Sequence, residues 1–426
     1  MPGSAIIEGQ AILLPWSSVV IRKVLSALCL LSACTTVGSQ TSVTVAQLEA
    51  RLAANHGKSD HELAHEIGLL ALKQRLSTAR LAQLETDLPG EKSRYALLAI
   101  GDESAFLELP PSEVLSTPPP DRATEKAILS RAVDFVGATV PKMPNFFATR
   151  EITRFQSLKP AQDLELDSSQ GMPSSSFRNE PQRNLPFRFA DSTQGTVLYR
   201  NGKEVVEPSE EKKKSNQVEG LTNWGEFGPL LAVVMSDILS GKLGWLHWEQ
   251  SPSGPIAVFR YQIEKDKSHY VVHYCCDPTS AVMNGNIELV PPYHGKIAID
   301  PASGAVMRFT VETEIDSKLP IKRAAIAMEY GPVEIGGVSY ICPIKSIAFS
   351  HAVSFSFTAA SVVPATPKSN LNGMRIIRPP ETISINDTAF TKYHMYRYEI
   401  RIVPDSPEEA SPKAAPSPLP DTPPHR

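Results

Sequence analysis

The clearest strand pattern lies in two parts of the chain, "GKIAIDPASGAVMRFTVETE" (residues 295–314) and "IKRAAIAMEYGPVEIGGVSYICPIKSIAF" (residues 321–349). Each contains two runs rich in apolar and β-branched residues. A Pro-Ala-Ser-Gly segment separates the runs in the first stretch, and Gly336-Gly337 separates them in the second. Such runs, joined by short turns, are typical of antiparallel hairpins. We therefore predict that this part of the chain forms an antiparallel sheet.

The same two-residue period occurs on both sides of these stretches. Residues 195–206 predict a hairpin that turns at Asn201-Gly202, a dipeptide suited to tight primed turns. Alternating apolar residues continue through 243–274, and a last strand is predicted near 396–402. Between them, residues 227–239 are apolar enough to predict a buried helix that ends at Gly241. The pattern predicts a meander of strands around one helix.

The chain divides into two globular blocks. Residues 43–107 predict a small helical domain, with a capping box from Ser59 to Glu62 and helices at 78–88 and 91–100. A Pro-rich linker is expected at 108–122. A β domain, which begins with a helix, is expected at 123–403. We expect disorder in an insertion at 157–186 and in the Pro-rich tail at 404–426. Asn386-Asp387-Thr388 suggests a turn. The predicted fold class is α+β.

The two opening stretches resemble the closing strands of the periplasmic lipoprotein-carrier superfamily, and "TVLYRNGKEVV" (196–206) resembles its earlier strands. The chain also resembles a group of large uncharacterised exported bacterial proteins, in which "PNFFATREITRF" and an "ND..F..YH..R" ending recur. The carrier resemblance implies a β half-barrel closed by the apolar helix, with acyl chains in the concavity between them. Five aromatic residues could line that concavity, namely Trp245, Trp248, Phe259, Tyr261 and Tyr270. Plain core packing is the alternative interpretation of the same residues.

Residues 1–40 predict export. Arg22 and Lys23 precede a short apolar run that ends in Leu31-Ser32-Ala33-Cys34, which looks like a bacterial lipobox. In that interpretation Cys34 is lipidated and anchors the protein to a membrane. Cleavage after Ser39 without lipidation is the competing interpretation. Either way, we expect the protein in the cell envelope, outer-membrane-anchored or periplasmic.

Three cysteines remain after the predicted leader, Cys275, Cys276 and Cys342. An exported protein meets an oxidising environment, so Cys342 could form a disulfide with one member of the doublet. Small buried thiols are the alternative.

One sharp catalytic motif is present. His61-Glu62-Leu63-Ala64-His65 matches HExxH, in which two His side chains hold zinc and the Glu acts as general base. Glu85 lies where one group of zinc peptidases places its third ligand. However, both His residues lie opposite the apolar stripe formed by Leu63 and Ile67, away from the predicted core. We therefore favour solvated histidines at a helix start and keep a zinc metallopeptidase as the alternative.

Composition excludes some functions. The 426 residues carry 42 Lys and Arg against 46 Asp and Glu, a net charge of −4, so nucleic-acid binding is not expected. The sequence favours a non-enzymatic envelope protein that needs no cofactor. We expect it to bind an acyl chain, a lipoprotein or another apolar ligand, or to serve as an interaction module in the envelope.

Overall fold

The structure is a computed structural model that describes twelve segments of the chain. They are residues 40–55, 57–139, 142–159, 162–164, 186–205, 220–221, 225–251, 254–275, 286–316, 318–353, 376–378 and 381–396. The predicted leader with Cys34 and the predicted tail lie outside the described residues. So do Cys276 and residues 165–185 of the predicted insertion.

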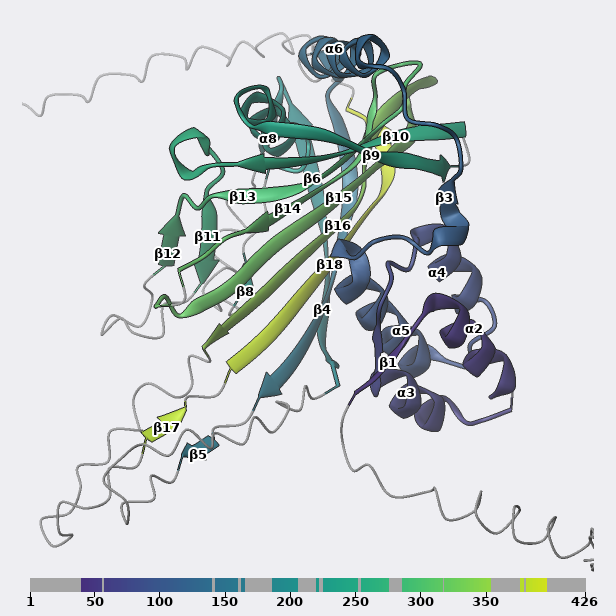
Figure 1. Ribbon diagram of the computed structural model, residues 1–426. Helices are drawn as coiled ribbons and strands as arrows, with labels where there is room; N and C mark the ends of the chain where they lie inside the picture. The colour runs from purple at the N-terminus through teal and green to yellow at the C-terminus, as the bar shows by residue number, and fades with distance from the viewer. Residues whose placement is uncertain are drawn as a thin grey trace, which may run out of the picture.

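A large antiparallel sheet forms the centre of the molecule (Figure 1). In spatial order its strands are β3 (Val114–Leu115), β9 (Lys242–Ser251), β10 (Gly254–Ile263), β13 (Tyr293–Ile299), β14 (Val306–Thr313), β15 (Ile321–Ile335), β16 (Val338–Val353), β18 (Glu381–Met395), β4 (Phe146–Lys159), β6 (Arg188–Arg200) and β7 (Lys203–Val205). The two ends of this order do not pair with each other, so the sheet is open. The predicted α+β class and antiparallel sheet are confirmed.

Helices and smaller sheets surround this centre. The helices are α2 (Val45–Ala54), α3 (Asp60–Gly68), α4 (Thr78–Glu85), α5 (Glu91–Glu103), α6 (Arg122–Thr139) and α8 (Pro229–Ser240), with short 3-10 turns at Ser104–Phe106, Pro111–Glu113 and Lys265–Lys267. A parallel pair joins β1 (Thr41–Val43) to β2 (Leu70–Leu72). A three-stranded sheet contains β12 (Asn286–Leu289), β11 (Val272–Cys275) and β8 (Gly220–Leu221), and β17 (Ile376–Arg378) pairs with β5 (Gln162–Leu164).

Both faces of the sheet are covered, which β15 shows most clearly. Ile326 and Met328 join the core beneath α6 and α8, whereas Ala325 and Ala327 join a core with α5 on the other face. Successive side chains of a strand point to opposite faces, so the run "AAIAM" is apolar without a break because each face needs its own apolar set. Figure 1 shows α8 and the helices α2–α5 on opposite sides of the sheet.

The helical domain therefore packs directly on the sheet. Phe106 and Phe349 meet edge to face across the boundary, and the Arg323 guanidinium lies 5.3 Å and 4.7 Å from their ring centroids. Lys296 bridges the same boundary with an ion pair of 2.8 Å to Glu108. The predicted linker at 108–122 is not free either, because β3 adds to the edge of the sheet beside β9.

Two further expectations are corrected, and a third falls mostly outside the described residues. Asn386-Asp387-Thr388 is not a turn but the middle of β18, which pairs with both β16 and β4. The predicted insertion at 157–186 begins inside β4 and includes β5. The last described strand is β18, which ends at Met395, so residues 397–402 of the predicted last strand fall outside the described residues.

Buried charges connect the helical domain to the sheet. The Lys345 ammonium on β16 lies 2.7 Å from an Asp102 carboxylate oxygen on α5 and 3.3 Å from one of Asp387 on β18. The Asp102 side chain is 1% exposed and that of Lys345 is 12% exposed. Burial raises the pKa of Asp102, and the neighbouring Asp387 adds to that effect. One ammonium thus serves two buried carboxylates.

Lys345→Met should destabilise the protein strongly, because it leaves both carboxylates buried without a cation. Breaking a buried ion pair on one side costs about 3–5 kcal/mol. Urea unfolding measures the change. The matched control is Lys242→Met, because Lys242 pairs with Glu264 at the surface with 72% of its side chain exposed. The urea concentration at which this variant is half unfolded should equal that of the wild type. Equal midpoints for both variants would contradict this account.

Candidate functional site

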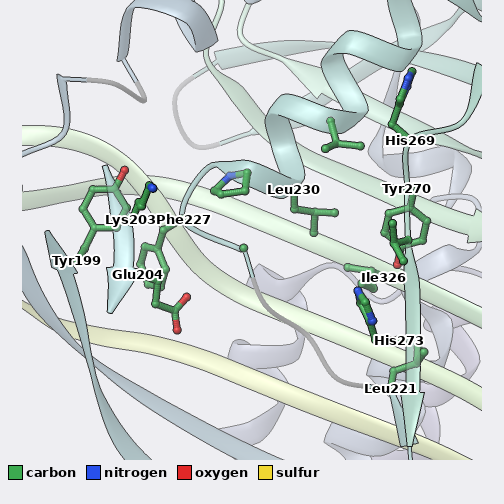
Figure 2. A pocket seen from close by; sticks show the side chains of 14 residues that line it. Tyr199, Lys203, Glu204, Leu221, Phe227, Leu230, His269, Tyr270, His273 and Ile326 are labelled. Carbon is green, nitrogen blue, oxygen red and sulfur yellow. The ribbon is translucent and has the colours of Figure 1, made fainter. Parts of the chain in front are cut away.

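A cavity of about 450 Å³ lies between α8 and the sheet face that α8 covers. Its apolar walls come from α8, the segment before it, β8 and β15; the residues are Leu221, Phe227, Pro229, Leu230, Val233 and Ile326. Tyr199, Lys203 and Glu204 border it from the β6–β7 hairpin. His269 and Tyr270 border it from the segment that leads into β11, and His273 from β11 itself. Figure 2 shows these two groups on opposite sides of Leu230. The volume falls within the range of small-molecule pockets.

The start of α8 shapes the cavity. Gly228 precedes the helix at φ 139°, a conformation that favours glycine, and Pro229 occupies the first turn, where its missing N–H is not needed. Leu231, Val234 and Ile238 are buried against the sheet. Leu230 and Val233 are only partly buried, and they face the cavity from the same helix.

One side of the cavity is formed by Tyr199, Lys203 and Glu204 of the β6–β7 hairpin. Asn201 and Gly202 both have positive φ, as the predicted primed turn requires, and the turn places Tyr199 directly opposite Glu204. Arg150 on β4 bonds to Glu204 at 2.7 Å and to Glu226 at 3.3 Å. Burial raises the pKa of Glu226, and Arg150 opposes that effect.

The opposite side carries a histidine held by a buried carboxylate. Asp237 on α8 accepts a hydrogen bond from the Tyr293 hydroxyl at 2.8 Å and one from the His269 backbone N–H at 2.9 Å, and it contacts the His269 ring at 2.6 Å. The His269 side chain is 73% exposed, whereas that of Asp237 is fully buried. Asp237 therefore fixes the loop that closes this side of the cavity.

Of the five aromatic residues predicted to line a concavity, Tyr270 borders this cavity. Phe259 is buried in the core, and Tyr261 donates a hydrogen bond to the Thr310 carbonyl, which lies against Gly295. Trp245 packs edge to face on Trp248, whose indole N–H donates to the Pro118 carbonyl of the linker at 3.0 Å. Phe259, Trp245 and Trp248 do not border this cavity, and Tyr261 borders a second cavity that is described below.

Most of the residues that line the cavity could not be predicted from the sequence. Leu230 and Val233 belong to the predicted helix and Tyr199 to the predicted hairpin, but no periodicity indicated that they border one cavity. Their approach depends on how α8 crosses the sheet. A second cavity, of about 670 Å³, lies beside Lys242, Arg260 and Lys296, with Glu312 and Glu314 in its wall. Its charged lining makes it the weaker candidate for an apolar ligand.

The sequence left two interpretations of Cys342 open, a disulfide and a small buried thiol. Cys342 is a free, buried thiol on β16, paired in register with Gly331 and packed with Phe146 and Tyr199. Burial raises its pKa to about 12, so it stays a thiol. Strand β11 belongs to a different sheet, and Cys275 is its last residue.

The HExxH residues do not assemble a metal site. His61 and His65 are exposed on α3, and the Glu62 carboxylate accepts hydrogen bonds from the Ser59 N–H at 3.1 Å and hydroxyl at 2.8 Å. Glu62 therefore closes the predicted capping box. Burial raises the pKa of Glu85, on α4, and Lys345 opposes that effect. Within the described segments, no group of three His, Cys, Asp or Glu residues is placed to hold a metal ion.

Comparison with protein-family models, with curated proteins and with solved structures finds no match to this chain. In the described part of the chain, no helix is long and apolar enough to cross a membrane.

Glu62→Gln should leave the melting temperature almost unchanged, whereas Glu62→Ala should lower it, because a glutamine can also complete a capping box. Hydrogen bonds from Ser59 lower the pKa of Glu62 below its ordinary 4.5. The stabilisation is therefore complete above about pH 4.5 and is lost as the pH falls through the lowered value. Thermal melts between pH 3 and 7 measure it. An unchanged melt for Glu62→Ala at neutral pH would exclude the capping role.

Proposed function

We propose that this protein is a non-enzymatic cell-envelope protein that holds an acyl chain or another apolar ligand in the cavity between α8 and the main sheet. The observation that carries the proposal is the cavity itself, about 450 Å³ with apolar walls beneath an apolar helix. Removal of apolar ligand surface from water provides the affinity. An open sheet with a helix over one face is also the arrangement that the resemblance to lipoprotein carriers implies, so we interpret the sheet as a half-barrel that α8 closes.

The helical domain does not contact the ligand in this proposal. It covers the sheet face opposite the cavity, where Phe106 and Ala99 pack with Ala325 and Ala327. A ligand under α8 therefore does not compete with the helical domain for apolar surface. In this proposal the domain stabilises the sheet, and the ligand binds to the remaining face.

A bulky side chain in the cavity should weaken binding of an apolar ligand. Val233→Trp fills the space beside Leu230, whereas Leu239→Trp adds the same side chain to the same helix at a position that is 68% exposed. We expect Val233→Trp to weaken binding of the uncharged fluorescent probe N-phenyl-1-naphthylamine by at least about tenfold, or about 1.4 kcal/mol. Leu239→Trp should bind as the wild type does. Unchanged binding by Val233→Trp would exclude this cavity as the site.

Substitution of Cys34 tests the proposed localisation in the cell envelope. If the lipobox is used, metabolic labelling with a palmitate analogue of cells that express the full sequence should mark the mature protein, and the label should be found in the membrane fraction, whereas Cys34→Ser should remain unlabelled. Cys29→Ser is the matched control, because that cysteine lies inside the predicted signal and is removed with it. Equal labelling of wild type and Cys34→Ser would show that Cys34 is not the acceptor.

A further inference from the structure

Carboxylates outnumber cations at the centre of the interface between the helical domain and the sheet. Among the residues that the structure describes there, four carboxylates and three cations are buried or partly buried together, namely Asp102, Glu249, Glu329 and Asp387 with Arg75, Arg308 and Lys345. A buried charge without a counterion is unfavourable, so the folded protein needs a way to neutralise the surplus.

The two arginines balance two of the carboxylates. Glu249 lies 2.6 Å from Arg75 and 2.7 Å from Arg308, so this group carries one positive charge in excess. Glu329 balances that charge, because it lies directly across from Arg308 in the pairing of β14 with β15. Within the cluster, the arginines therefore leave no charge for the two aspartates.

Lys345 alone serves both aspartates. Its ammonium lies 2.7 Å from Asp102 and 3.3 Å from Asp387, and the exposed fractions of the two aspartate side chains are 1% and 10%. The cavity beside Asp102 and Lys345 has a volume of only about 20 Å³, room for one water molecule but not for a hydrated cation. Burial raises the pKa of Asp102, and the charge of Asp387 raises it further. A bound proton is the neutralisation that this space allows.

The neighbouring charged groups do not remove the surplus. Glu85 on α4 and Glu151 on β4 add negative charge near Asp387, and Arg94 on α5 acts on Glu85. One further cation thus faces two further carboxylates. The cluster remains short of positive charge when all of its elements, α4, α5, β4, β9, β14, β15, β16 and β18, are considered.

The cluster lies between two separate apolar cores. Leu97 and Ile100 of α5 pack in the core of the helical domain itself, whereas Ala99 and Phe106 pack with Phe349 of the sheet. A change of charge between the two cores therefore acts on the docking of the domain more than on the interior of either part.

We propose that the interface between the helical domain and the sheet is a pH-sensitive switch, in which one proton held by Asp102 and Asp387 keeps the domain docked. Loss of the proton leaves two negative charges on one ammonium and weakens docking. An acid whose pKa is raised by folding contributes stability that is complete below about pH 3.8, the ordinary aspartate value, and that is lost as the pH rises through the raised value. The switch goes beyond the proposed ligand binding, which uses the other face of the sheet.

Asp102→Asn tests the switch in the full chain, because asparagine has the shape of a protonated aspartate and cannot ionise. Urea unfolding of variant and wild type is compared between pH 5 and 8.5. Relative to the variant, the unfolding constant of the wild type should rise by up to about tenfold per pH unit, as one proton requires. The comparison at each pH cancels the other titrating groups. A ratio that stays constant, or that changes in the opposite direction, overturns the proposal.

The matched control for this comparison is Asp87→Asn. Asp87 is exposed after the end of α4, so its variant should keep the pH dependence of the wild type. A control that loses the pH dependence as Asp102→Asn does would mean that the effect does not come from the interface, which also overturns the proposal.

Hydroxyl-radical footprinting distinguishes undocking from global unfolding. Phe349 is 4% exposed beneath the helical domain, and Phe309 is 0% exposed in the core on the α8 side. Oxidation of Phe349 in the wild type should increase between pH 5 and 8.5, whereas Asp102→Asn should keep it protected. Phe309 should stay protected in both proteins. Oxidation of Phe349 that does not change with pH, or that Phe309 matches, overturns the switch.

Asp387→Asn tests whether the two aspartates share the proton. Either asparagine alone neutralises the surplus, so Asp387→Asn should also remove the pH dependence. The double variant leaves the Lys345 ammonium without either carboxylate, so it should unfold at lower urea concentration than each single variant. A double variant that is more stable than both would show that the aspartates do not act as one site, and it would overturn the sharing of the proton.

Discussion

Double burial of the central strands is the constraint on which the structure depends. β15 places Ile326 and Met328 on one face and Ala325 and Ala327 on the other, and all four side chains are buried. Such a strand is stable only where both faces are covered, because an exposed apolar face of this length would be prone to pairing and aggregation. The α8 side and the helical domain are the two covers. The domain is therefore part of the fold, although it forms a separate block in the sequence.

Covering the second face also buries charge. Asp102, Lys345 and Asp387 lie between α5 and the sheet, and nearby the Glu249 carboxylate is held by both Arg308, at 2.7 Å and 2.8 Å, and Arg75, at 2.6 Å. Hydrogen bonds from Arg308 help to lower the pKa of Glu249 despite its burial. Buried pairs add little net stability relative to apolar residues, but they penalise any arrangement that leaves one member alone. They thus fix how the helical domain sits on the sheet.

The cavity on the other face follows from incomplete coverage. Helix α8 buries Leu231, Val234 and Ile238 against the sheet, yet its first turn leaves Leu230 and Val233 facing open space. The first turns of α8 therefore border an apolar space that its own side chains do not fill.

The local elements could be predicted from the order of the amino acids alone. The capping box at Ser59, the turn at Asn201-Gly202, helix α8 with its end at Gly241 and the hairpin at Gly336-Gly337 could all be predicted, because each depends on neighbours a few residues away. Other features could be seen only in the folded chain: Asp387 lies within β18, Glu85 does not form a group of metal ligands with His61 and His65, and Tyr199 packs on Phe227 just before α8. These depend on contacts between distant residues, such as Lys345 with Asp102, and neither periodicity nor a short motif encodes which distant elements meet.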